Sequence, residues 1–545
     1  MPMSDLHFLT IAQAAKLIGA RKLSPLELTQ VCLARVEELD EQINAFITVT
    51  GELAIKQARA AEAQIMAGRY LGPLHGIPFG LKDLIATAGI LTSGNSKVGI
   101  GYVPKEDAAA TAKLYQAGAV LLGKQAASEF AHGGPAFDSP WPPARNPWNP
   151  AHFTGGSSSG SAAAIAAGFV PGALGSDTGG SVRTPAALCG TVGLKPTYGL
   201  VSRYGIIPYS FTFDHCGPLA WTVEDCAIML GAIAGYDARD SGSVQRTVPD
   251  YRAALTSDIR GMRVGVVRHF WEQDVKTDGQ QARAMNDALD LLKHSGAKVE
   301  DVHMRPLQQY VDVNMVIAET ESFCVHHKDL IERSQEFGRN FLARALPGCL
   351  FQATEYFGAQ RERRRMLAEM SALYEKYDVL ITAGSGPAPG LARYSPRNAW
   401  IVPNIYMAFS VTAGPAIAVC NGFTHDGLPL SMQIAAAPFA EENVLRVAHA
   451  YEQATPWRAR RPHLVSGVPR VPVAPPPSVA GPALDPAARA QVEWLARRAG
   501  LELDDPQLTL LCDVAPHAFA AAARINRSHS WTDEPAEVFH PPFGS

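Results

Sequence analysis

The sequence has no excess of basic residues and no hydrophobic run long enough to cross a membrane. Lys and Arg number 48 against 52 Asp and Glu, which gives a formal net charge of −4. Surfaces that bind nucleic acid or anionic lipid carry a basic excess, so we expect neither partner. The Ala- and Gly-rich run 162–175 contains Pro171 and falls short of the ~20 residues of a spanning helix. It is better interpreted as a buried helix leading into a strand.

Cysteine and histidine patterns are also missing. The eight cysteines are scattered without C-x-x-C, and the N-terminus shows no secretory signal, so we expect free thiols in a cytoplasmic protein. The sixteen histidines show no metal-ligand spacing. The pair His326-His327 lies in a predicted helix and is interpreted as a solvated face, not a ligand pair. The sequence therefore predicts no metal and no cofactor.

Two other signatures fail. No G-x-x-x-x-G-K-[ST] phosphate loop occurs, so nucleotide binding has little support. Residues 156–160, GSSSG, satisfy the G-x-S-x-G nucleophile elbow with Ser158 as nucleophile, but that elbow needs a strand before it. The preceding residues 141–154 are rich in proline and lack strand alternation, so the elbow's context is absent.

What the sequence does contain is a segment dense in Ser and Gly, from Gly155 to Arg183. Ser157 and Ser181 each follow a Gly-Gly pair, and such pairs suggest tight turns or close approach to another group. A serine at the end of such a turn can lie beside free backbone N–H groups, which is what acyl transfer needs. Taken singly, each serine could equally be a turn residue or a helix N-cap.

A serine hydroxyl needs a base to take its proton. Lys82 lies inside an apolar run, 72–89, punctuated by Gly and Pro. Burial disfavours the charged ammonium group and can lower the pKa of lysine from about 10.4 by several units. A neutral Lys82 could then act as general base, with a second hydroxyl relaying the proton. Judged alone, Lys82 and Asp83 could also form an ordinary surface ion pair.

Together these residues resemble the amidase signature hydrolases. Lys82 stands in a G-x-P-x-x-x-K-D context, Ser157 is the first serine after Gly155-Gly156, and Ser181 ends D-T-G-G-S. Residues 183–199 look like the continuation of the family motif, and the resemblance extends from about residue 5 to about residue 463. It implies an α/β fold, with one large mixed β-sheet in an α/β/α layered arrangement, and hydrolysis of an amide C–N bond without a cofactor.

The resemblance also implies a catalytic role for three side chains. Ser181 would attack the amide carbonyl and form an acyl-enzyme. Ser157, in a cis peptide, would pass the proton to neutral Lys82 and return it to the leaving nitrogen. The oxyanion hole would be formed by backbone N–H groups of Thr178, Gly179, Gly180 and Ser181.

Three further residues receive supporting roles by the same resemblance. Asp177 and Arg183 flank the nucleophile and are expected to hold the turn, and Ser158 is expected to hydrogen-bond around the lysine. Two departures from the family pattern, Trp221 and residues 381–390, could enlarge or reshape the substrate pocket. The arginine cluster 361–366 is interpreted as a solvated helix face, from which one Arg could turn inward.

Three functions stay open. The leading hypothesis is an amidase that acts on a small-molecule amide, such as an aryl amide, carbamate or urea-derived amide. It would work as a homodimer, with no nucleic acid and no membrane as partner. The alternative is an amidotransferase-type glutaminase subunit that delivers ammonia to a partner enzyme. The third, a non-catalytic binding relative, is disfavoured because Lys82, Ser157 and Ser181 are all present.

Apolar runs and amphipathic patterns alternate along residues 1–467, the expected amidase signature domain. Strand-like runs occur at 75–81, 118–123, 262–267, 297–302, 377–383, 415–423 and 428–436. Helices are expected at 24–39, where Ser24-Pro25-Leu26-Glu27 forms a capping box, and at 161–168, 282–296 and 441–455.

After this domain the composition changes. Residues 468–482 are Pro-rich and predict a semi-extended linker. Residues 483–545 form a helical appendage, with helices beginning at Asp485-Pro486 and Asp505-Pro506, a kink at Pro516 and an extended tail over 526–545. So small a piece cannot bury its apolar stripes alone, so it should pack on the main domain or a twin subunit. It resembles the small partner subunit of tRNA-dependent amidotransferases and related heteromeric amidases, fused in cis. An unrelated helical appendage is the alternative.

Overall fold

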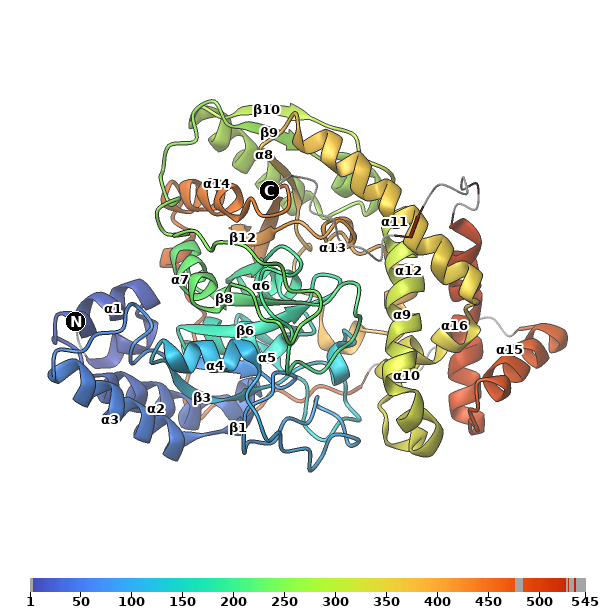
Figure 1. Cartoon of the computed structure of the whole chain (residues 1–545), viewed down its shortest axis with the longest axis horizontal. Coiled ribbons are helices and arrows are strands. Elements are labelled where there is room, and N and C mark those ends of the chain that lie inside the picture. Colours follow the sequence, from blue (N-terminus) through green and yellow to red (C-terminus); the bar gives the residue numbers. More distant parts are fainter. Residues whose placement is uncertain (1–2, 476–483, 526–527, 529–533, 536–545) are drawn as a thin grey trace.

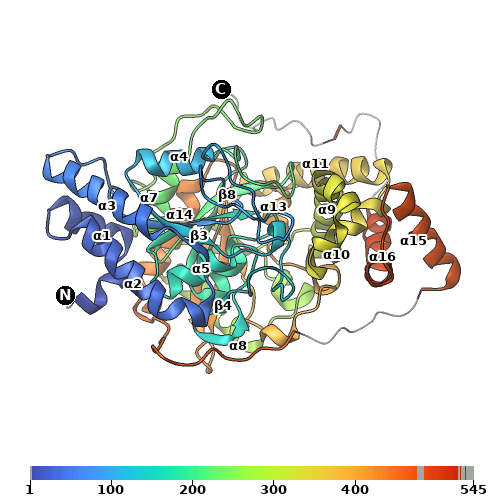
Figure 2. The same ribbon diagram turned by 90° about the horizontal axis from the view of Figure 1, so that it is seen from below.

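The computed structural model describes residues 3–475, 484–525, 528 and 534–535. One mixed sheet of eleven strands runs through the molecule in the order β1-β3-β2-β6-β8-β7-β12-β13-β11-β9-β10. Helices cover both of its faces (Figures 1 and 2). The strands are β1 Phe46–Val49, β2 Pro78–Lys82, β3 Val120–Gln125, β6 Gly172–Asp177, β7 Val192–Lys195, β8 His215–Ala220, β9 Arg263–Val266, β10 Lys298–Asp301, β11 Val379–Ala383, β12 Ala416–Phe423 and β13 Pro429–Ala435. The predicted α/β/α arrangement around a large mixed sheet is confirmed.

The α-helices form the layers on the two faces of this sheet. They are α1 Ile11–Gly19, α2 Pro25–Ile43, α3 Gly51–Met66, α4 Ala109–Gln116, α5 Ser159–Ala166, α6 Arg183–Cys189, α7 Val223–Ile233, α8 Gly279–His294, α9 Leu307–Glu332, α10 Arg339–Ala345, α11 Ala353–Tyr374, α12 Asn398–Ile401, α13 Met407–Val411, α14 Glu441–Gln453, α15 Pro486–Arg498 and α16 Asp505–Arg524. Both α5 and α7 pack against β6 and β8, from opposite faces of the sheet (Figure 2).

The start of α2 shows how the local sequence sets a helix boundary. Ser24 Oγ accepts hydrogen bonds from the backbone N–H groups of Leu26 and Glu27, and Pro25 occupies the first helical position. The helix continues past the predicted end to Ile43, because the buried stripe continues through Leu39 and Ile43. It ends at Asn44, whose backbone is left-handed (φ 53°).

The centre of the sheet positions the motif residues. Strands β2 and β6 are parallel neighbours, with Leu81 opposite Leu174, and every residue of both strands is buried. Lys82 ends β2 and Asp177 ends β6. Because parallel strands end at the same edge of a sheet, the segment that follows β6 begins beside Lys82.

Residues 141–154 differ from the sequence expectation. They contain two short paired strands, β4 Arg145–Asn146 and β5 Asn149–Phe153, which form a separate two-stranded sheet. The pairing closes over the turn Pro147-Trp148, where Trp148 N donates to Asn146 Oδ1. Short pairing of this kind leaves no alternating pattern for sequence analysis to detect.

The histidine pair was interpreted wrongly for His326. Its ring is buried beside Phe130, with the ring centroids 4.4 Å apart, and beside Phe341, and burial lowers its pKa to about 3. Only His327 is exposed. Among the described residues no group of three metal-ligating side chains occurs and no cysteine forms a disulfide. In the same part of the chain, no helix combines the length and apolarity that crossing a membrane requires.

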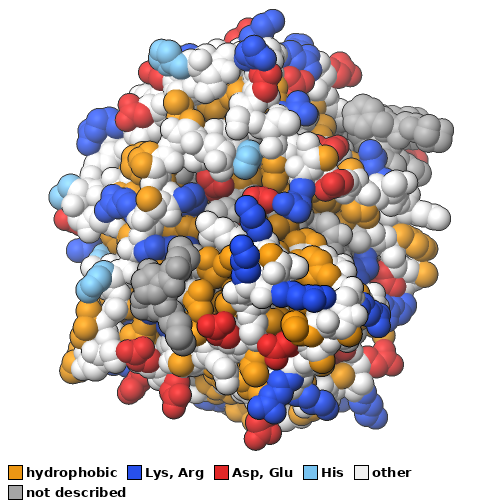
Figure 3. Space-filling model, turned by 90° about the vertical axis from the view of Figure 1, so that its left-hand side faces the viewer, with side chains coloured by type: hydrophobic (Ala, Val, Ile, Leu, Met, Phe, Trp, Pro, Cys, Tyr) orange, Lys and Arg blue, Asp and Glu red, His pale blue; other side chains and the backbone are white. Residues whose placement is uncertain are grey.

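On the end of the molecule shown in Figure 3, basic and acidic side chains are interspersed with small apolar areas. The C-terminal helices α15 and α16 lie at the opposite end, where α16 packs against α9 and α10 and α15 packs against α16 and the short helix at Leu346–Leu350 (Figure 1). The predicted tail over 526–545 lies almost entirely outside the described residues. Pro516 lies inside α16, which runs unbroken from Asp505 to Arg524, so the predicted kink does not end the helix.

Candidate active site

Lys82 is fully buried, so the surface ion pair with Asp83 is excluded. Its Nζ lies 2.5 Å from Ser157 Oγ and 2.9 Å from Ser176 Oγ. Asp83 instead lies with Lys124, at 3.4 Å, and with Ser93. Burial lowers the pKa of Lys82 to about 7, against the opposing effect of Asp214 and Asp177. A substantial fraction of Lys82 is therefore a neutral amine near neutral pH.

Ser157 is buried, and the peptide bond that joins it to Gly156 is cis. Its backbone carbonyl accepts a hydrogen bond from Ser128 N. The neighbouring Ser158 differs from expectation, because its Oγ donates to the carbonyl of Ser176 at 3.3 Å and not to the lysine. Its backbone N–H donates to the carbonyl of Ser181. Ser158 is therefore a structural link between the two serine segments, and Ser176 is the second hydroxyl on Lys82.

Neither the cap nor the elbow interpretation describes these serines. Helix α5 begins at Ser159 without a side-chain cap from Ser158. Ser158 is fully buried and does not line the pocket, whereas Ser181 is partly exposed in it. Of the serines in the motif, Ser181 is thus the one that a ligand can reach.

Asp177 organises the turn that carries Ser181. Its carboxylate accepts from the backbone N–H groups of Gly180, at 2.7 Å, and Val182, at 3.1 Å, and pairs with Arg183 at 3.0 Å through both Nε and Nη2. Burial opposes ionisation of Asp177, but the Arg183 guanidinium outweighs it and holds the pKa of that carboxyl well below its usual range. All these groups lie away from the pocket surface, which is consistent with a structural role.

The expected oxyanion hole is modified by the same carboxylate. The N–H of Gly180 already donates to Asp177, so it is not free to stabilise an oxyanion, contrary to the expectation. The N–H groups of Thr178, Gly179 and Ser181 donate to no described protein group. Gly180 has φ +114°, and a Cβ there would meet Tyr406 Cβ at 2.7 Å, so only glycine fits.

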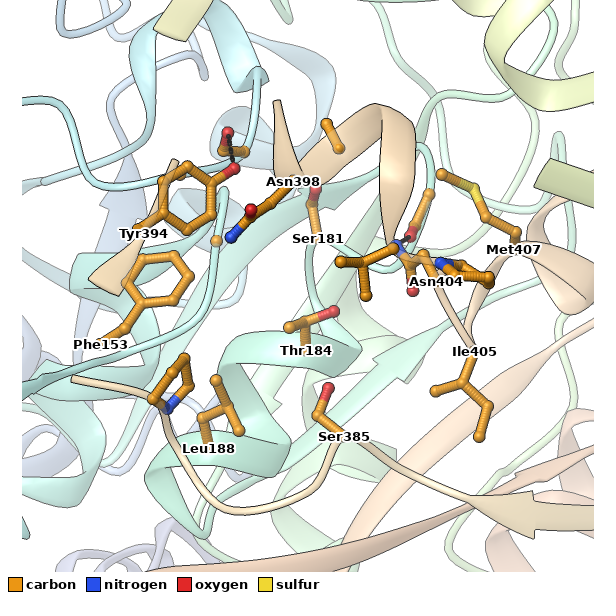
Figure 4. Close-up of a pocket in the computed structure, with 18 of the residues that line it drawn as sticks. Phe153, Ser181, Thr184, Leu188, Ser385, Tyr394, Asn398, Asn404, Ile405 and Met407 are labelled. Carbon is orange, nitrogen blue, oxygen red and sulfur yellow. Dashed lines mark hydrogen bonds between the residues drawn. The ribbon is translucent and has the colours of Figure 1, made fainter. Parts of the chain in front are cut away.

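Ser181 opens into a pocket of about 420 Å³, a volume suited to a small ligand. Figure 4 shows Phe153, Leu188 and Tyr394 on one side and Ile405 and Met407 on the other. Residues 384–387 and Pro389 form part of the wall, so the departure at 381–390 does shape the pocket.

The other sequence departures lie elsewhere. Trp221 is buried under Arg461, whose guanidinium carbon lies 3.5 Å from the ring centroid, and its Nε1 donates to the carbonyl of Arg458. It does not line the pocket, so the expectation that it reshapes the pocket is wrong. In the cluster 361–366, Arg363 turns inward and donates to the carbonyl of Val411, also away from the pocket.

Sequence reasoning missed Arg344, the one charged side chain among the described residues that line the pocket. Its Nε and Nη2 donate to Glu319 Oε1 at 2.8 and 2.5 Å, and Nη2 also contacts the Tyr209 hydroxyl. Its Nη1 donates to no described group. No local sequence motif predicts the cluster of Arg344, Glu319 and Tyr209, because its members come from separate parts of the chain.

The Lys82 environment predicts a pH dependence. A general base must be unprotonated, so the rate of Ser181 acylation should rise with pH and reach half its plateau near pH 7. At pH 6 the rate should be about tenfold below the plateau. A kcat/KM profile for amide cleavage from pH 5 to 9 measures this. A profile that is flat or falls between pH 6 and 8 would contradict Lys82 as the base.

Comparisons with known proteins agree on one family. The family model described as Amidase matches residues 27–445. The A subunit of glutamyl-tRNA(Gln) amidotransferase from Methylococcus capsulatus is 40% identical over 484 residues, which cover 84% of this chain and 99% of the relative. The protein of the same name from Chloroflexus aggregans is 38% identical over 488 residues, covering 85% of this chain and 99% of the relative.

Solved structures give the same picture. Native peptide amidase from Stenotrophomonas maltophilia has a TM-score of 0.73 and 32% identity, covering 84% of this chain and 98% of that one. A chain from a vestigial complex related to the origins of an s-triazine catabolic enzyme has a TM-score of 0.76 and 32% identity, covering 82% of this chain and 98% of that one.

The names of the curated relatives correct one expectation. We expected a homodimer acting on a small-molecule amide without nucleic acid, but these relatives are subunits of an amidotransferase named for glutamyl-tRNA(Gln). The partner expectation is therefore wrong. The expectation of no nucleic-acid partner rested on the near-neutral net charge of this chain. The net charge of one chain is a poor guide to such a partner, because in an assembly of several proteins another subunit can carry the surface that binds nucleic acid.

Proposed function

The chain belongs to the amidase family, whose members act on carbon–nitrogen bonds, and from that premise we propose that it is an amidotransferase-type glutaminase subunit. It would hydrolyse a primary carboxamide at Ser181 and deliver the ammonia to a partner enzyme. The observation that carries the chemistry is the contact between buried Lys82 and Ser157 Oγ at 2.5 Å. Identity to the amidotransferase relative over 99% of that relative's length supports the subunit role.

In the proposed acylation, Ser181 Oγ attacks the carboxamide carbon. Its proton passes to Ser157 Oγ as Ser157 gives its own proton to neutral Lys82 Nζ. The oxyanion is stabilised by the free N–H groups of Gly179 and Ser181. The relay then runs backward, so the leaving nitrogen gains a proton and departs as ammonia, and the acyl group stays on Ser181.

Deacylation uses the same groups with water as the nucleophile. Water attacks the acyl carbon and loses a proton through Ser157 to Lys82. The same proton then goes to Ser181 Oγ as the ester bond breaks, which frees a carboxylic acid and returns all three side chains to their starting states. Ser176, hydrogen-bonded to Lys82 Nζ at 2.9 Å, keeps the amine oriented throughout.

The pocket supports a small substrate with a carboxylate, such as glutamine. Its volume of about 420 Å³ accommodates an amino acid. Arg344 brings an unused Nη1 donor to a wall that is otherwise uncharged among the described residues. A guanidinium is suited to binding a carboxylate.

Ammonia release from glutamine tests the proposal. We expect one ammonia per glutamate formed, and a kcat/KM for glutamine at least about tenfold above that for butyramide, which lacks the carboxylate. The rate should rise when the remaining subunits of the Methylococcus capsulatus amidotransferase are added. The Ser181→Ala variant measures the background release of ammonia. Cleavage of butyramide but not glutamine, at a rate unaffected by those subunits, would contradict the glutaminase role.

A further inference from the structure

Helix α16 packs on the outer side of three elements whose inner sides line the pocket. It contacts α9, α10 and α12, which contribute Asn314, Arg344 and Asn398 to the pocket. All of α16 lies beyond residues 27–445, the part that the family model matches. Helix α16 is therefore an addition to the family domain. It contacts the pocket-lining elements on their outer sides and not the pocket itself.

Sequence and packing explain how α16 binds there. Asp504 caps the helix by accepting from Gln507 N, and Pro506 lies in its first turn. Its buried face repeats every three or four residues and ends in small side chains, which let the helix approach its neighbours closely. The buried apolar residues are Leu508, Leu510, Leu511, Cys512, Val514, Ala515, Ala518, Ala521 and Ala522.

One ion pair fixes the far end of α16 to α9. Arg524 donates through Nε and Nη2 to the two carboxylate oxygens of Asp312, at 2.7 and 2.6 Å. The Asp312 side chain is 3% exposed and that of Arg524 46%. Apart from Arg524, Asp312 Oδ1 accepts from Gln308 Nε2 at 2.9 Å. Arg524 thus neutralises a buried charge in the second turn of α9, a helix that lines the pocket.

Two hydrogen bonds connect the elements that α16 contacts to the turn that carries Ser181. On α9, two residues beyond Asp312, Asn314 Nδ2 lies 3.5 Å from the carbonyl oxygen of Thr178. After α12, the chain runs to Asn404, whose Nδ2 donates to the carbonyl of Gly179 at 2.8 Å (Figure 4). The Thr178 carbonyl belongs to the same peptide group as the N–H of Gly179, one of the two N–H groups proposed to stabilise the oxyanion.

The chain before α15 supports the pocket from another direction. Arg145 Nη1 donates to the carbonyl of Val471 at 2.5 Å. Val473 packs against the buried cluster of Phe153, Leu188, Ala388 and Leu391, of which Phe153 and Leu188 line the pocket. The C-terminal extension therefore touches the site's supports at both the linker and α16.

We propose that the C-terminal helix α16 is a positioning element for the amide site, and that Arg524 is its positioning residue. By holding Asp312, Arg524 fixes α9, and by packing on α12 the helix fixes the segment that ends at Asn404. Together they hold the carbonyls of Thr178 and Gly179, and with the first of these the peptide group that carries the Gly179 N–H, so that this donor is in place for the oxyanion of the attacked amide. The change in kcat that this inference predicts rests on the proposed function.

The test compares Arg524→Gln in the full chain with Arg524→Lys and with Arg497→Gln. Arg497 forms an exposed pair with Glu493 inside α15 and is the matched control. We expect Arg524→Gln to lower kcat for glutamine about tenfold or more with less than a threefold change in KM, a loss of about 1.4 kcal/mol in transition-state binding. Arg524→Lys should keep at least half of the activity. Asp312→Asn/Arg524→Gln, which removes the unpaired charge, should recover to within about threefold of wild type.

A second readout does not need turnover. Hydrogen exchange followed by mass spectrometry should show faster exchange in residues 307–316 and 398–407 of Arg524→Gln than of Arg497→Gln, at a temperature where both remain folded. Normal exchange and normal kcat in Arg524→Gln would overturn the inference. If wild type does not cleave glutamine, the proposed function fails, and the exchange comparison still decides the role of α16.

Discussion

Replacing Ser181 with alanine will lower amide hydrolysis by roughly 10⁴- to 10⁶-fold. The change removes the oxygen that we propose as the nucleophile, and neither Ser157 nor Ser176 can replace it, because both are buried around Lys82. Ser181 is partly exposed in the pocket, so losing one oxygen creates no buried cavity. The thermal midpoint should therefore stay within about 2 °C of wild type. A coupled assay for ammonia measures the rate, and differential scanning fluorimetry measures the midpoint.

Ser161→Ala is the matched control for this variant. Ser161 lies in the same Ser- and Gly-dense segment, but its Oγ donates to the carbonyl of Leu174 and it lies outside the pocket. It should keep activity within about threefold of wild type. If Ser181→Ala kept most of its activity, the nucleophile would have to be another group.

Replacing Arg183 with methionine will lower the free energy of unfolding by about 3–5 kcal/mol, because it leaves the buried Asp177 carboxylate without its cation. Arg183 also donates to Ser410 Oγ at 2.7 Å and to the carbonyl of Tyr406. Those acceptors would lose a partner at the same time. Activity should fall as well, since Asp177 holds the turn that ends at Ser181. Urea unfolding followed by circular dichroism gives the free energy.

The control for this prediction is an exposed pair of the same type. Arg260 pairs with Asp258 at 2.6 Å, and their side chains are 79% and 54% exposed. Solvent screens such a pair, so Arg260→Met should leave the urea midpoint unchanged. Equal midpoints for Arg183→Met and wild type would show that the buried pair does not support the turn.

The strand-like runs of the sequence predicted β2, β3 and β9 to β13, and the run 162–175 predicted a strand where β6 begins, whereas β1, β7 and β8 were not predicted. Lys82, Ser157 and Ser181 stood out for a different reason, which is that their motifs match a family with few alternatives. Both signals are local in the chain. The structure brings these local pieces together where parallel β2 and β6 end.

What sequence analysis missed is non-local. Ser176 is an ordinary strand residue in the sequence, and only strand pairing places it beside Lys82. The role of Arg344 can be inferred only from its contacts with Glu319 and Tyr209. Gly180 lost its expected free N–H because the Asp177 carboxylate folds back onto it. Substrate and partners were hardest, because pocket walls and surfaces depend on the packing of many segments.

One measurement tests the central claim, that Lys82 activates Ser181 through Ser157, without knowledge of the substrate. The chain is treated with phenylmethanesulfonyl fluoride, and intact and peptide mass spectrometry follow the adduct as a function of pH. The account predicts one adduct, on Ser181, at a rate that rises through about pH 7 and falls at least about 100-fold in Lys82→Met and Ser157→Ala. An adduct on another residue, or an unchanged rate in Lys82→Met, would contradict it.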